Sequence, residues 1–163
     1  MTFEFTPRDI PQQNSLAEVG FATCANRGRA LMARANVPTD IRTKVWTAAF
    51  MTATLLDGLM SIEIDGVINS RYEHWCGMNP KFAKYLRLWG EAGTVKTKTT
   101  TTPKVKDRGV PCMMIGYALE HPGDTYRMWN PDTNGVYQSR HVIWMKRMYY
   151  QKKILSNEEI SPS

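Results

Sequence analysis

The chain has 163 residues, of which 42% are hydrophobic and 10% aromatic, so wholesale disorder and low-complexity repeats are excluded. Its apolar stretches are far shorter than the roughly 20 residues of a membrane-spanning helix, and the polar N-terminus is unlike a signal peptide. The net charge of +6 is carried by residues 81–110, with 8 Lys/Arg against 2 Asp/Glu. Such a stretch fits phosphate or another acidic partner, or a solvated surface.

Two helices are predicted first, over residues 15–35 and 39–57. Apolar and small residues recur in the first segment at steps of four and three, which places them on one helical face: Ala17, Phe21, Cys24, Gly28, Leu31 and Ala35. Pro38 separates the segments. The second helix has a similar stripe, made of Ile41, Val45, Ala48, Ala49, Thr52, Leu55 and Leu56.

The apolar period changes to two near residue 59, which predicts strands. Asp65-Gly66 indicates a turn, and residues 71–77 indicate a short helix. Strands are then predicted at 86–96, 112–118, 125–130 and 136–145, with a hairpin turn at Asn134-Gly135. Short strands at this spacing favour a compact antiparallel barrel within about 84–147.

The sequence offers little support for catalysis or for a metal site. It has no Gly-x-Ser-x-Gly elbow and no phosphate-cradling glycine motif. The three cysteines are an odd number with no C-x-x-C pair, which predicts free thiols in a reducing compartment. His74 and Cys76 could be half a metal site without a second pair, and we favour a packed loop histidine and a buried thiol. On composition alone, Glu18 is a helix-capping carboxylate.

Four segments in order resemble copia-type retrotransposon integrases. PQQNSLAE at 11–18 is similar to the turn and helix that carry the last acidic residue of their Asp-Asp-Glu triad. Residues 26–38 with the following helix resemble the helices that close the integrase core, and 71–93 resemble the family's Tyr-Glu-x-Trp to Leu-Arg-x-Phe-Gly run. Residues 109–144 resemble its C-terminal small-barrel signature, with Tyr-Arg-x-Trp-Asn-Pro and Ser-Arg-x-Val.

The resemblance implies that Glu18 is the third carboxylate of the triad. In complete integrases the three carboxylates hold two magnesium or manganese ions. The strands that carry both aspartates lie upstream in the family, so we expect no cofactor, no metal and no catalysis by this chain alone. Departures from the family pattern are Ser15 in place of glycine, Val19 and Gly20 in place of a basic pair, and His141 in place of aspartate.

The predicted fold class is α+β, with a helical remnant of a ribonuclease-H-like core followed by a small antiparallel SH3-like barrel. The expected division is 1–58 for the core helices, 59–83 for a connecting segment, 84–150 for the barrel and 151–163 for a polar tail. The helices would lack the sheet that they normally cover. We therefore expect poor burial of four apolar side chains, which would favour association: Phe21, Leu31, Val45 and Leu55.

The function implied by the resemblance is that of an integrase fragment whose barrel binds DNA weakly and without sequence preference. Candidate phosphate contacts are the basic residues of the threonine-rich segment and a pair beyond it: Lys96, Lys98, Lys104, Lys106 and Arg108, then Lys146 and Arg147. Tyr126, Trp129 and Trp144 could stack on bases, although we favour a core role. Other expected partners are the missing integrase half or a second copy, at a cytoplasmic or nuclear location, with no membrane. The alternatives are a protein-interaction module and a decayed product without present function.

Overall fold

The computed structural model describes residues 15–96 and 109–151, and it opens with the two expected helices. Helix α1 is Ser15–Arg34 and α2 is Thr39–Gly58. Asn36 ends the first helix in the left-handed region at φ 54°, a conformation that asparagine tolerates better than most residues. Its side-chain Nδ2 donates to the carbonyl of Tyr150, 3.2 Å away, and so connects this bend to the end of the described chain.

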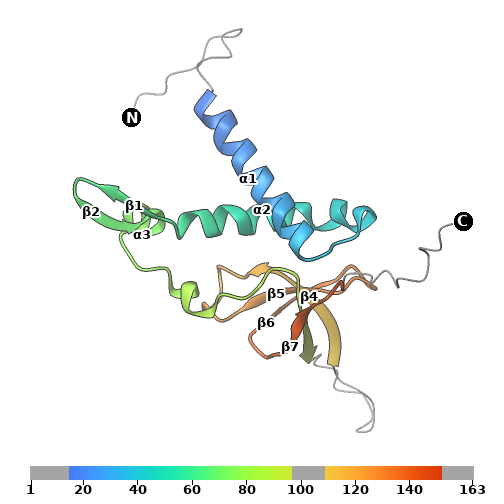
Figure 1. The fold of residues 1–163 in the computed structure, drawn as a ribbon. Helices are drawn as coiled ribbons and strands as arrows, with labels where there is room; N and C mark the ends of the chain where they lie inside the picture. The colour runs from blue at the N-terminus through green and yellow to red at the C-terminus, as the bar shows by residue number, and fades with distance from the viewer. Residues whose placement is uncertain (1–14, 97–108, 152–163) are drawn as a thin grey trace, which may run out of the picture.

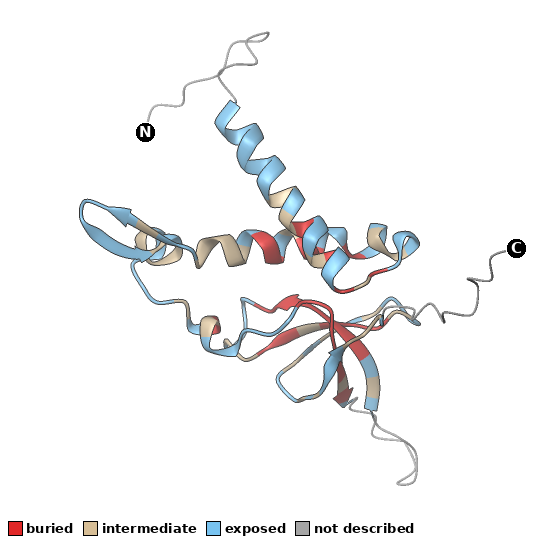
Figure 2. Cartoon of the chain, viewed as in Figure 1, coloured by how far each residue is buried: buried red, intermediate tan, exposed pale blue. Residues whose placement is uncertain are grey.

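The two ends of α1 lie in different environments. Gly28 and Met32 in the C-terminal half are buried against α2, whereas every residue from Ser15 to Thr23 is exposed (Figure 2). Phe21 is 65% exposed even though its ring lies 5.2 Å from that of Phe50. The expectation of poor burial therefore holds for Phe21 and in part for the half-buried Leu31 and Leu55, but it is wrong for Val45, which is 1% exposed.

A small hairpin and a short helix follow α2. Strands β1 (Ser61–Ile64) and β2 (Val67–Ser70) pair antiparallel around Asp65 and Gly66, whose φ angles of 52° and 78° are typical of a tight hairpin turn. Helix α3 (Arg71–Cys76) begins with a capping box, because Ser70 Oγ accepts from the backbone of Glu73 and the Glu73 carboxylate accepts from the backbone of Ser70. Both the predicted turn and the predicted short helix are confirmed.

Five strands form the main sheet after the 3₁₀ helix η2 (Lys81–Tyr85). They are β3 (Glu91–Lys96), β4 (Gly109–Tyr117), β5 (Tyr126–Trp129), β6 (Val136–Ser139) and β7 (Val142–Met148). Their spatial order is β6-β5-β4-β3-β7, with every neighbouring pair antiparallel. The two long helices lie on one side of this sheet (Figure 1). The helices followed by an antiparallel sheet confirm the predicted α+β class.

The sheet differs from the prediction at two points. The strand expected at 86–96 begins only at Glu91, because Gly90 has a φ of 88° that interrupts the extended backbone. The single strand expected at 136–145 is two strands at opposite edges of the sheet, separated by Arg140 and His141. A two-residue connection between the edges requires the sheet to curl strongly. Closure into a barrel and the ribonuclease-H-like origin of the helices stay predictions.

The helices and the sheet share one hydrophobic core. Its fully buried members come from both layers, and they include Ala35, Val45 and Ala49 beside Cys112, Met113 and Met128. Two buried donors converge on one carbonyl of β4: Trp89 Nε1 donates to Ile115 O over 3.0 Å, and the Thr52 hydroxyl shares its proton between Ala48 O at 2.9 Å and Ile115 O at 3.2 Å. The α2 helix is thereby fixed against β4 by packing and by a hydrogen bond.

Gly90 is where the two layers approach most tightly. A Cβ atom at this position would overlap the Cβ atom of Ala35, which is 0% exposed. The backbone of Gly90 is held on both sides, because its N–H donates to Met114 O and its carbonyl accepts from Tyr149 N. Neither the glycine nor the alanine can therefore be enlarged without moving the helices off the sheet.

We predict that Gly90→Ala lowers the free energy of unfolding by about 2–4 kcal/mol, from steric overlap and from the left-handed backbone. In Gly90→Ala/Ala35→Gly the overlap is relieved and only the backbone strain remains, so the double variant should recover part of the loss. Urea unfolding of both single variants and the double variant measures this coupling. Strictly additive losses would show that the two residues do not meet.

Candidate nucleic-acid interface

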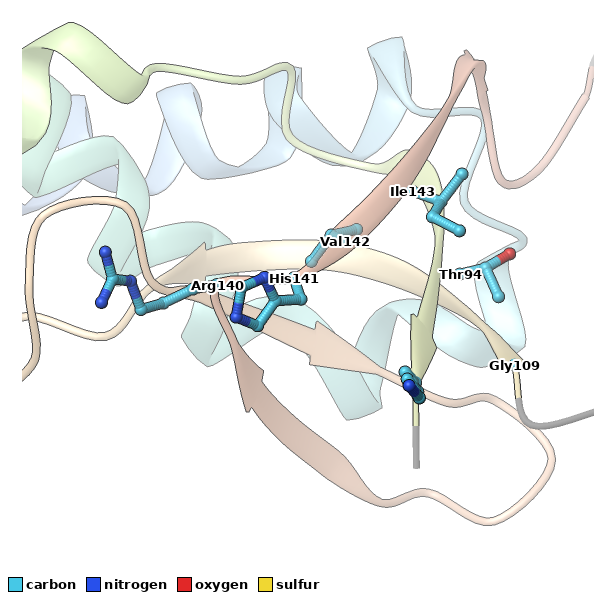
Figure 3. Close-up of a pocket in the computed structure, with 7 residues that line it drawn as sticks. Thr94, Gly109, Arg140, His141, Val142 and Ile143 are labelled. Carbon is cyan, nitrogen blue, oxygen red and sulfur yellow. The ribbon is translucent and has the colours of Figure 1, made fainter. Parts of the chain in front are cut away.

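A basic hollow lies where β3, β4 and the turn between β6 and β7 meet (Figure 3). Lys96 ends β3 and is the register partner of Gly109, which begins β4. The turn supplies Arg140 and His141, and the hollow has a volume of about 470 Å³. Thr94, Val142 and Ile143 form its remaining walls. Cationic groups at the rim of an apolar hollow can contact phosphate while the walls contact sugar or base.

The turn itself is fixed by short-range polar contacts. Ser139 Oγ accepts from the backbone N–H of His141 at 3.1 Å and donates to its carbonyl at 3.2 Å. The Arg140 guanidinium donates through Nε and Nη2 to Asp124 Oδ2, at 2.9 Å and 2.8 Å. This hydrogen bond to Arg140 is the main cause that lowers the pKa of Asp124 below its usual range. Asp124 therefore orients Arg140 and offsets part of its charge.

A second basic hollow lies on the other side of Arg140. It has a volume of about 740 Å³, and Lys81 and Lys84 of η2 face it together with Arg140. Lys81 and Lys84 are three residues apart on a 3₁₀ helix, where side chains at this spacing share a face. The two hollows thus place cations from η2, β3 and the β6–β7 turn on both sides of Arg140. We call this surface, made of Lys81, Lys84, Lys96, Arg140 and His141, the basic corner.

The structure does not bring all the expected phosphate contacts together. Lys96 belongs to the basic corner, whereas Lys146 and Arg147 lie at the opposite end of the β3–β7 ladder, next to Glu91 rather than Val95. There they line a separate hollow of about 580 Å³ with Arg87 and Glu91. Four further candidates lie outside the described residues: Lys98, Lys104, Lys106 and Arg108.

The candidate stacking aromatics belong largely to the interior. Tyr126 and Trp129 are 6% and 4% exposed, and the Tyr126 hydroxyl donates to Tyr85 O at 3.0 Å. Trp144 is half-buried, with the Arg87 guanidinium 4.8 Å from the centre of its ring. This cation–π contact and the burial of the other two rings agree with the favoured core role.

Glu18 lies on the exposed part of α1. Across residues 15–96 and 109–151, no three His, Cys, Asp or Glu side chains are grouped so that they could hold a metal ion. No helix in those same ranges is long and apolar enough to cross a membrane. Among the described residues, Glu18 is therefore not part of a three-carboxylate group of the kind that holds two metal ions in a complete integrase.

The His74 and Cys76 pair is placed differently from the expectation. His74 lies on helix α3 rather than in a loop, and its Nε2 is buried without a hydrogen-bond partner among the described residues. Cys76 is exposed, so the expectation of a buried thiol is wrong at this position. Cys112 is instead the buried thiol, and burial raises its pKa to about 11. All three cysteines are free.

Sequence reasoning missed four residues of the basic corner: Lys81, Lys84, Arg140 and His141. The signal for Arg140 is the pair of polar residues that follows Ser139 and breaks the alternation of the predicted strand. Lys81 and Lys84 were part of the basic stretch at 81–110, but only the folded chain shows that η2 brings them beside the β6–β7 turn.

Comparison with known proteins identifies the C-terminal half and gives a relative for most of the chain. Residues 93–158 match the retroviral polymerase SH3-like domain. Over 142 residues the chain is 28% identical to the retrovirus-related Pol polyprotein from transposon TNT 1-94 of Nicotiana tabacum, and this alignment covers 86% of the chain but 10% of the polyprotein. No solved structure matches. The chain is therefore similar to part of a retrotransposon Pol polyprotein over most of its length, and residues 93–158 match the SH3-like domain.

Proposed function

We propose that the chain is an integrase fragment whose SH3-like domain binds nucleic acid through the basic corner. The observation that carries this proposal is that Lys96 and Gly109 are register partners beside Arg140. The sequence between them contains Lys98, Lys104, Lys106 and Arg108. The most basic segment of the chain is thus anchored at both ends in a hollow that already presents cations.

The chemistry of the basic corner fits phosphate rather than base recognition. Lysine and arginine neutralise phosphates along a backbone, and such contacts carry no sequence information. Asp124 compensates part of the charge of Arg140, which leaves Lys81, Lys84 and Lys96 as the basic side chains of the corner without an ion pair among the described residues. Binding should therefore be weak, roughly micromolar or poorer at physiological salt, and insensitive to sequence.

A second function is favoured by the exposed half of α1. Leu16 is 88% exposed, Val19 64% and Phe21 65%, so this helix presents apolar side chains to solvent. A protein-interaction module would use such a surface to dock the upstream integrase half or a second copy. This interaction would be insensitive to salt, whereas phosphate binding by the basic corner would weaken steeply as salt rises.

We predict that Lys96→Gln/Arg140→Gln weakens the binding of labelled DNA about tenfold and lowers the slope of log affinity against log salt by about 1 to 2, because Asp124 already offsets part of the charge of Arg140. The matched control is Lys146→Gln/Arg147→Gln, which removes the same charge from the opposite end of β7. Titration of duplex and single-stranded DNA at several salt concentrations measures both quantities. Equal losses in the two variants would show that net charge alone governs binding.

The segment between β3 and β4 is tested by a variant in which five basic residues are changed to alanine together: Lys96, Lys98, Lys104, Lys106 and Arg108. We expect it to lose most of the affinity and to reduce the salt slope by a few units. Unchanged affinity and slope would place the binding surface elsewhere. Far-UV circular dichroism of each variant confirms that the fold is retained.

We also predict that the chain alone shows no magnesium- or manganese-dependent strand transfer or DNA cleavage. The reason is that Glu18 belongs to no group of three metal-binding side chains in the described part of the chain, whereas two ions need the full set of three carboxylates. An assay with a labelled DNA end and a target duplex in each metal tests this. Metal-dependent joining that disappears in Glu18→Gln would contradict the prediction.

A further inference from the structure

A separate cavity lies between α2 and the hairpin formed by β5 and β6. Its volume is about 390 Å³, within the range of small-molecule sites. Lys44, Thr47 and Met51 line it from α2, at the three- and four-residue steps that place side chains on one helical face. Arg127 of β5 and Asn134 of the following turn line it from the sheet. We call this cavity the α2–β5 groove.

The polar lining of the α2–β5 groove is cationic. Lys44 and Arg127 approach it from opposite walls, and no acidic residue is among the described residues that line it. Within the described chain neither Lys44 nor Arg127 forms an ion pair. Asp40 on α2 and Asp132 beside Asn134 are the acidic groups of the two walls, and both lie outside the lining. An anion placed between the two cations would therefore be attracted from both sides.

Most of the rest of the lining is apolar. Six of the ten lining residues carry apolar side chains, and two of these, Met51 and Val136, are 54% and 46% exposed. An inorganic anion would gain nothing from such walls, and a neutral apolar molecule would gain nothing from the cations. The lining instead fits an anionic group joined to a partly apolar body, with the Asn134 amide able to donate and accept hydrogen bonds at its edge.

The fold holds both walls of the α2–β5 groove in place. Thr52 Oγ1 donates to Ile115 O at 3.2 Å, which fixes α2 on the sheet (Figure 1). On the other wall, Asn130 Oδ1 accepts from Asp132 N at 2.9 Å, and Asn134 adopts a φ of 54° before Gly135. A site whose walls are fixed before binding loses little conformational freedom when a ligand enters.

We propose that the α2–β5 groove binds one nucleotide, with its phosphate between Lys44 and Arg127 and its base against Met51 and Val136. This site is distinct from the basic corner. The groove lies at the Trp129–Val136 end of the β5–β6 ladder, whereas the corner lies at the Tyr126–Ser139 end. Nucleotide binding by the groove does not require DNA binding by the basic corner. Each of the two can fail while the other holds.

The experiment titrates the full chain with thymidine 5′-monophosphate, thymidine and inorganic phosphate while the side-chain NMR signals of Trp129 and Met51 are followed. We expect the nucleotide to bind more tightly than either of its parts. Lys44→Gln and Arg127→Gln should each weaken nucleotide binding about tenfold, because each removes one charge-assisted contact, and should leave thymidine binding unchanged.

The matched control is Arg29→Gln, which removes one charge from the exposed surface of α1. It should leave nucleotide binding unchanged, as should the corner variant Lys96→Gln/Arg140→Gln. Two-dimensional amide spectra show whether each variant folds. If one groove variant does not fold, the other groove variant alone tests the proposal. Nucleotide affinity equal to that of phosphate or thymidine, or unaffected by both groove variants, would overturn the proposal.

Discussion

The contact between Ala35 and Gly90 sets the distance between the helical layer and the sheet. Gly90 supplies a backbone with φ 88° and no side chain at the point where Ala35 is fully buried. The neighbouring Trp89 is 4% exposed and donates to Ile115 O, the same carbonyl that accepts from Thr52 of α2. Close packing over these few residues lets the helices complete the core of a sheet that is small on its own.

This shared core places the basic residues on different sides of the molecule. The β5–β6 ladder has Arg140 beyond its Tyr126–Ser139 end and the lining residues Trp129 and Val136 at its other end. Lys44 lies beside Trp129 and Val136 only because α2 is docked on the sheet. The α2–β5 groove is therefore a product of both layers, whereas the basic corner is built from η2 and the sheet.

The sequence predicts those parts of the fold that depend on local periodicity and turn chemistry. The two long helices follow from three- and four-residue spacing, and the β1–β2 hairpin follows from Asp65-Gly66. The sequence does not predict the break between Ser139 and Val142. The segments on both sides of it are extended, and they differ only in the strands with which they pair. The burial of Val45 was also missed, since it depends on the sheet that α2 covers.

The same distinction applies to the candidate sites. Lys96 could be identified from the charge of its segment, but Arg140, which lines the same hollow, comes from a distant part of the chain and reaches it only through the fold of the sheet. The exposure of Phe21 likewise reflects tertiary structure, because its ring meets Phe50 of α2 while α1 residues on either side of it stay exposed. Periodicity identifies a face but not what covers it.

The central claim is that the helices and the SH3-like sheet unfold as one unit. Native-state amide hydrogen exchange on the full chain tests it directly, by comparing Val45 and Ala49 of α2 with Met113 and Met114 of β4. The shared core predicts that all four amides exchange through the same global opening, with equal free energies and equal dependence on denaturant. Exchange of the α2 amides through a separate opening of lower free energy would contradict it.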